Sequence, residues 1–130
     1  MNIAFTDQEI LKLKILDISA LILFGSQAQG VANDASDFDI FVIGKKTASA
    51  YDFVYEIISE KINKLINLDI VFETSAPMEL QSHVAKYGQV LYQENNSVFP
   101  DFKQKIMIFY SDFAPLRQIY SNATMERINL

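Results

Sequence analysis

The chain has 130 residues, no cysteine and only three prolines, and half of its residues are apolar. A chain of this length and composition can bury enough surface to fold without a disulfide, and it lacks the bias of disordered sequences. The net charge of −5 argues against nucleic acid as a direct partner, because binding a phosphate backbone requires clustered Lys and Arg. No apolar run approaches the ~20 residues that span a bilayer, so we expect a cytoplasmic protein with no membrane contact.

Helix and strand signals alternate along the first part of the chain. Thr6, followed by Glu9, forms a capping-box pair that predicts the start of a helix. The short apolar run Leu21–Phe24 predicts a strand that is covered on both faces. The run Asp39–Ile43 is rich in residues that favour strands and predicts a second one.

The next part of the chain predicts a helix, a strand and a helix. Apolar residues recur at helical spacing over Ser49–Ile66, which predicts an amphipathic helix. Leu68–Phe72 predicts a third strand, and Pro77 suits the first turn of a helix that should stop near Gly88.

A last helical pattern runs from Phe99 to Leu116, within a C-terminal helical segment of about 98–130. Pro115 predicts a kink or break near Ala114. No linker or repeat divides the chain, so residues 1–130 are interpreted as a single domain. The predicted fold class is α/β (α+β), a small mixed β-sheet flanked by helices near Asp7, Ser49, Pro77 and Phe99, with acidic residues at one edge of the sheet.

The candidate site lies where the first two predicted strands meet. Gly25 and Ser26 follow the first strand, and after a gap of ten residues come Asp37 and Asp39. Residues two apart on a strand point to the same face, so both carboxylates should point to one place. Asp69 adds a third carboxylate if its strand neighbours the second one. Two such charges ~4 Å apart repel by about 4 kcal/mol at an effective dielectric of 20, so this cluster predicts a divalent cation, Mg²⁺ or alternatively Mn²⁺.

The Gly25-Ser26 pair is suited to binding phosphate. Glycine lets the backbone turn sharply and approach a triphosphate, and the serine offers a hydroxyl beside main-chain donors. Alone, a Gly-Ser pair is usually a turn and an Asp-x-Asp pair is usually a solvated loop. The specific signal is their combination at this spacing with a further acid in the third strand.

Together these residues resemble the signature of the polymerase-beta-like nucleotidyltransferases. The resemblance is closest to the minimal nucleotidyltransferases, the MntA-type antitoxins that are partners of HEPN-domain toxins. Ser36–Ile40 is similar to that family's Ser-Asp-x-Asp stretch, and Gly88–Tyr92 and Tyr110–Leu116 are similar to its C-terminal portion.

The resemblance implies both an activity and a partner. It implies the polymerase-beta-like nucleotidyltransferase fold and transfer of AMP from ATP to a tyrosine hydroxyl of a cognate HEPN-type toxin, which neutralises the toxin. The hydroxyl would attack the α-phosphate in line and release pyrophosphate, and the chain would form a hetero-oligomer with the toxin. By the same resemblance Asp37, Asp39 and Asp69 would be catalytic residues and metal ligands, with Asp69 as general base.

One departure keeps two alternatives open. Many relatives carry arginines after the Gly-Ser pair, whereas this chain has Gln27 and Gln29, which bring no fixed positive charge to the triphosphate. The first alternative is an antitoxin that neutralises its toxin by binding alone. The second is a small-molecule nucleotidyltransferase of the antibiotic-modifying kind, which usually needs an acceptor pocket from a second domain or subunit.

Other polar and aromatic residues have simpler interpretations. His83, Lys45 and Lys46 are interpreted as surface residues. An aromatic stripe near the C-terminus is interpreted as core packing, with any exposed part expected to form a partner patch. Its members are Phe102, Phe109, Tyr110, Phe113 and Tyr120.

Overall fold

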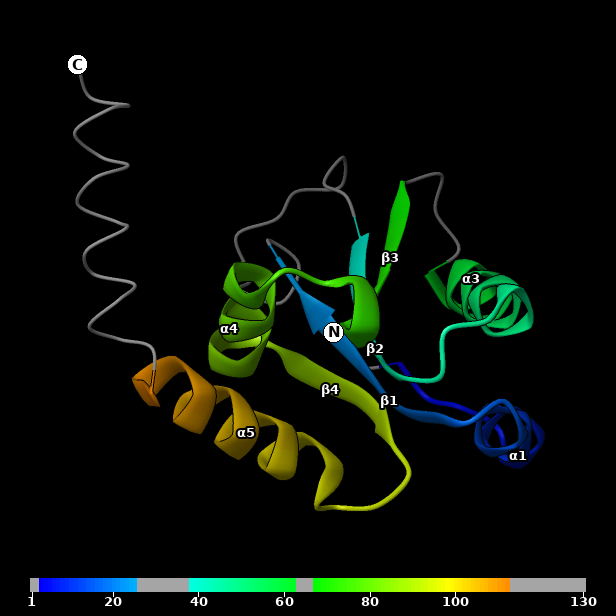
Figure 1. The fold of residues 1–130 in the computed structure, drawn as a ribbon. Coiled ribbons are helices and arrows are strands. Elements are labelled where there is room, and N and C mark those ends of the chain that lie inside the picture. The colour runs from blue at the N-terminus through cyan, green and yellow to red at the C-terminus, as the bar shows by residue number, and fades with distance from the viewer. Residues whose placement is uncertain (1–2, 26–37, 63–66, 113–130) are drawn as a thin grey trace.

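The computed structural model of the chain describes residues 3–25, 38–62 and 67–112. Four α-helices, one 3₁₀ helix and four strands lie within these residues (Figure 1). In chain order they are α1 (Asp7–Ile15), β1 (Ile18–Phe24), β2 (Phe38–Gly44), α3 (Ala48–Ile62), β3 (Leu68–Phe72), η1 (Glu73–Ser75), α4 (Met78–Tyr87), β4 (Gln89–Gln93) and α5 (Val98–Asp112).

The strands form one mixed sheet in the order β3-β2-β1-β4. β1 is antiparallel to both β2 and β4, whereas β2 and β3 are parallel and are separated in the chain by α3. The predicted mixed sheet is therefore confirmed. It has one strand more than predicted, because β4 extends it beyond β1.

Helices cover both faces of the sheet, with α1 and α3 on one side and α4 and α5 on the other (Figure 1). Two separate apolar clusters fill the two interfaces. β1 contributes to both clusters and six of its seven residues are buried, which confirms the prediction of a strand covered on both faces.

Side chains of β2 alternate between these two clusters. Phe38, Ile40 and Val42 pack in the cluster under α1 and α3, whereas Phe41 packs in the cluster under α4 and α5. Because successive strand residues point to opposite faces, Asp39 lies on the face that α4 and α5 cover.

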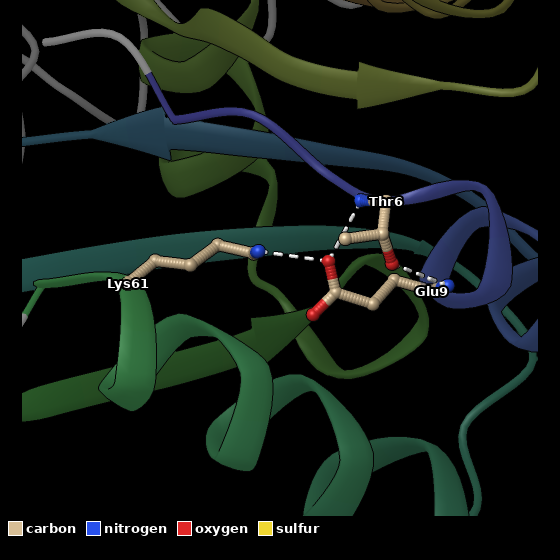
Figure 2. A network of polar contacts seen from close by, with 3 residues as sticks. All are labelled: Thr6, Glu9 and Lys61. Atoms are coloured by element: carbon tan, nitrogen blue, oxygen red, sulfur yellow. Dashed lines mark hydrogen bonds and ion pairs between the residues drawn. The ribbon is translucent and has the colours of Figure 1, made fainter.

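The predicted capping box is present at the start of α1 (Figure 2). The Thr6 main-chain N–H donates to Glu9 Oε1 at 2.8 Å, and the Glu9 N–H donates to Thr6 Oγ1 at 3.1 Å. Lys61 of α3 adds an ion pair of 2.7 Å to the same Oε1. These contacts, with the hydrogen bond from Lys61 first among them, lower the pKa of Glu9 below its ordinary value. The cap thereby also links α1 to α3.

Most predicted boundaries agree with the structure where it describes them. Gly88 is the C-cap of α4, as expected, and Pro77 is its N-cap, one position before the first turn in which it was predicted. α3 begins at Ala48, one residue before its predicted start, and its predicted end at Ile66 lies outside the described residues, as does the predicted break near Ala114. η1 was not predicted. Among the described helices, none has both the length and the apolar character needed to cross a membrane.

Candidate functional site

Two of the predicted acids stand side by side on neighbouring strands. Asp39 of β2 and Asp69 of β3 are register partners in the parallel pair. Neighbouring strands lie about 4.8 Å apart, and side chains in register point to the same face. Both carboxylates therefore lie on the face covered by α4 and α5. Asp39 is partly buried, and Asp69 is exposed on the edge strand.

Gly25 lies directly against the Asp39 side chain. Phe24, the residue before it, pairs with Asp39 across the antiparallel β1–β2 ladder. Gly25 has a φ of +78°, and a Cβ built on it would lie 2.4 Å from Asp39 Oδ2. Gly25 adopts the positive φ that suits the predicted sharp turn, and its bare backbone lies against one of the carboxylates.

The remaining predicted site residues lie outside the described part of the chain. These are Ser26 and Asp37. Gln27 and Gln29, which depart from the family pattern, also lie outside the described part. Within residues 3–25, 38–62 and 67–112, no three or more His, Cys, Asp or Glu side chains come together in a way that could hold a metal. Since this range contains only two of the three predicted ligands, the metal site stays a prediction.

A cluster of two aromatic rings and a lysine lies at the C-terminal end of α4, and it was not predicted from the sequence. It consists of His83, Lys86 and Tyr87, and we call it the α4 ring cluster. The His83 and Tyr87 rings are 5.1 Å apart, and Lys86 Nζ lies 5.4 Å from the centre of the Tyr87 ring. Tyr87 remains 44% exposed. The spacing of two rings four residues apart, just before the glycine that ends the helix, was the available signal.

The other residues considered in the sequence behave in different ways. Lys46 Nζ donates to Ser75 Oγ at 2.6 Å, near the end of β2 that is opposite to Asp39. Of the aromatic stripe, Phe102 is buried as expected and Phe109 is 43% exposed. Tyr110, Phe113 and Tyr120 have no described side chains, so their role as a partner patch stays a prediction.

Solved structures of toxin–antitoxin complexes contain chains with a similar fold. A chain of a toxin–antitoxin complex with AMP-PNP is 23% identical, with a TM-score of 0.70 over 93% of this chain and 99% of that chain. A chain of the Shewanella oneidensis complex of tri-AMPylated HEPN toxin with MNT antitoxin is 20% identical, with a TM-score of 0.62 over 91% and 97% of the two chains. An MntA–HepT toxin–antitoxin chain is 19% identical, with a TM-score of 0.61 over 92% and 99%.

Sequence comparison identifies the family. No curated protein matches the chain. The family model described as polymerase beta, nucleotidyltransferase, matches residues 8–97, which is more than half of the chain and includes both described acids and Gly25. The protein therefore belongs to the polymerase beta nucleotidyltransferase family.

Proposed function

We propose that this protein is an antitoxin nucleotidyltransferase that transfers AMP from ATP to a tyrosine hydroxyl of a cognate HEPN-type toxin and so neutralises it. The observation that carries the proposal is the pair of register-matched carboxylates, Asp39 and Asp69, beside the glycine turn at Gly25. Family membership supports nucleotidyl transfer. The similar solved structures include a toxin–antitoxin complex with AMP-PNP and a tri-AMPylated HEPN toxin with its antitoxin. The proposal includes a hetero-oligomer with the toxin in the cytoplasm.

The two described acids suit a divalent cation. Carboxylate oxygens are the hard ligands that Mg²⁺ prefers, and these two lie on one face of neighbouring strands. We propose that Asp39 and Asp69, together with Asp37, hold Mg²⁺ or alternatively Mn²⁺. When bound, such a cation neutralises phosphate oxygens and stabilises the charge on the attacking and leaving oxygens.

The protein groups would divide the remaining work. Gly25 lets the main chain approach the triphosphate, and Ser26 would contribute its hydroxyl there. Asp69, the more exposed acid, would act as general base and accept the proton of the tyrosine hydroxyl. The hydroxyl oxygen would then bond to the α-phosphorus while the bond from that phosphorus to the bridging oxygen breaks. Pyrophosphate leaves and AMP remains on the tyrosine.

A second candidate function is neutralisation by binding alone. The observation that favours it is the pair Gln27 and Gln29 in the segment after the Gly-Ser pair, where many relatives carry arginines. Without those cations the triphosphate would be held less firmly, and the chain could retain the fold and the partner while losing the reaction.

Co-expression with the product of the adjacent gene separates the two candidates. We expect the partner to copurify and its tyrosine peptides to carry the added mass of AMP. The Asp39→Asn and Asp69→Asn variants should retain the partner but lower transfer by orders of magnitude, because the metal-binding charge is gone. Asp52→Asn, an exposed acid on α3, is the matched control and should transfer normally.

The opposite result is equally clear. A wild-type protein that neutralises its partner fully while leaving the partner's mass unchanged would establish the binding antitoxin instead. Normal transfer by Asp39→Asn would remove the catalytic role of the acid pair.

A further inference from the structure

The α4 ring cluster lies at the same end of the sheet as the acid pair. After Gly88 the chain enters β4, whose first residue, Gln89, pairs with Leu23 of β1. Leu23 precedes Gly25 by two residues, which is about 7 Å along a strand. Figure 1 shows α4 lying beside β1, next to the start of β4.

The cluster and the acids also share one face of the sheet. Val84 of α4 is fully buried in the same apolar cluster as Phe24 and Phe41. Phe24 is the register partner of Asp39, so the side of the sheet that carries Asp39 is the side on which α4 packs. A Cβ on Gly88 would lie 2.6 Å from Ile22 Cγ2, so this end of α4 is seated directly on β1.

The composition of the cluster suits the neutral, flat part of a nucleotide. The Tyr87 ring carries the Lys86 ammonium over one face. A nucleobase can stack on that face in place of the ammonium, because every nucleobase has a π-face. The end of α4 is a helix C-terminus, where the partial negative charge disfavours phosphate. The triphosphate therefore belongs at Gly25 and the cation site, and the base belongs at α4.

We propose that the nucleobase of the triphosphate substrate stacks on the ring of Tyr87, with His83 as the positioning residue that supports the ring. This inference rests on the proposed function and deepens it by naming residues that hold the base.

Calorimetry with two ligands tests whether the base stacks on Tyr87. Both ATP and inorganic tripolyphosphate are titrated in Mg²⁺, since only ATP carries a base. Tyr87→Leu should lower the affinity for ATP by about tenfold and leave the affinity for tripolyphosphate unchanged. Tyr87→Phe should bind both ligands with wild-type affinity because the ring is retained. Tyr55→Leu is the matched control, since Tyr55 is 45% exposed and stacks on Tyr51 of α3, on the opposite face. Circular dichroism establishes that each variant is folded.

A second measurement uses the wild-type protein alone. The triphosphate of 2-aminopurine riboside loses fluorescence when its base stacks, so binding should quench it. Binding without quenching overturns the proposal. So does a folded Tyr87→Leu variant that keeps the wild-type affinity for ATP, or one whose affinities for ATP and tripolyphosphate fall equally. Failure of the proposed function gives a different result. If ATP binding depends on Tyr87 but no AMP is transferred to the toxin, the proposed stacking on Tyr87 is still supported. A wild type that binds no ATP in Mg²⁺ overturns both.

Discussion

Two features of the structure require glycine at position 25, its backbone conformation and the neighbouring side chain of Asp39. Gly25 has a φ of +78°, and an added Cβ would meet Asp39 Oδ2 at 2.4 Å. Gly25→Ala must therefore strain the turn or displace the carboxylate, and the backbone strain alone is roughly 1–2 kcal/mol. We expect Gly25→Ala to lower stability in urea unfolding and to lose ATP affinity in calorimetry of the folded protein.

Gly44 provides a control at the opposite end of β2. A Cβ there would lie 2.5 Å from the main-chain oxygen of Asp17, far along the strand from Asp39. Gly44→Ala should destabilise the protein while the folded fraction keeps its ATP affinity. If Gly25→Ala binds ATP normally, the role given to the glycine turn is wrong.

The hydroxyl of Tyr92 is a buried polar group without a hydrogen-bond partner among the described residues. The Tyr92 side chain is 7% exposed, and its ring packs edge-on against Phe5. A buried hydroxyl without a partner costs about 1–3 kcal/mol, so Tyr92→Phe should be at least as stable as the wild type and up to about that much more stable. Urea unfolding at pH 7 measures the difference, and a marked loss of stability would show that the hydroxyl has a partner.

The same hydroxyl predicts a change of stability with pH. Burial first, and the nearby charge of Glu94 second, raise the pKa of Tyr92 above its ordinary value of 10.0. Above pH 10 the unfolded chain releases this proton before the folded chain does, so the folded state loses stability as pH rises through that range. Tyr92→Phe should show less of this alkaline loss than the wild type.

At the scale of elements, the capping box joins α1 to the rest of the molecule. Thr6 and Glu9 satisfy the first turn of α1, and Lys61 anchors the same carboxylate to α3 (Figure 2). Glu9→Gln should lower the free energy of unfolding by about 1 kcal/mol at pH 7, which thermal or urea unfolding would detect.

The pH dependence of that variant identifies the cause. The pKa of Glu9 is lowered in the folded state, so its contribution is present above its ordinary value of 4.5 and is lost as pH falls through the folded pKa. The wild type and Glu9→Gln should converge in acid. In a double-mutant cycle with Lys61→Met, a coupling energy near zero would mean that the ion pair does not contribute.

The sequence predicted those elements whose side-chain pattern was strong. Short apolar runs identified β1, β2 and β3, and helical spacing identified α3 and α5. Local end signals identified the other two helices, the capping box for α1 and the pair Pro77 and Gly88 for α4. β4 was missed because a five-residue edge strand with two exposed residues shows neither a continuous apolar run nor clean alternation. Its identity as a strand depends on pairing with β1, which is a tertiary interaction.

The candidate site was predicted unevenly for a similar reason. The meeting of Asp39 with Asp69 required only that the second and third strands be neighbours, and this is confirmed. The close contact of Gly25 with Asp39 follows from register, which residue types alone do not fix. The α4 ring cluster was missed because its relation to the site depends on how α4 ends against β1.

At the scale of the whole molecule, nucleotide binding should depend on a divalent cation. The chain carries a net charge of −5, and its two described site acids point to one face. Carboxylates and phosphates repel unless a cation lies between them, so ATP should bind in Mg²⁺ and raise the midpoint of thermal unfolding. Excess chelator should abolish both effects. Equal ATP affinity with and without chelator would mean that the acids serve another purpose.

The position of Asp69 on an edge strand has a consequence for how the sheet opens. Asp39 and Asp69 face each other near one end of the β2–β3 ladder, whereas Phe72, at the other end, is buried. Repulsion between register-matched charges should make the ladder fray from the acidic end, so backbone amides near Asp69 should exchange with deuterium faster than those near Phe72. Salt should reduce that gradient by screening. A bound nucleotide with its cation should remove it, so that the substrate completes the edge of the sheet on which the reaction depends.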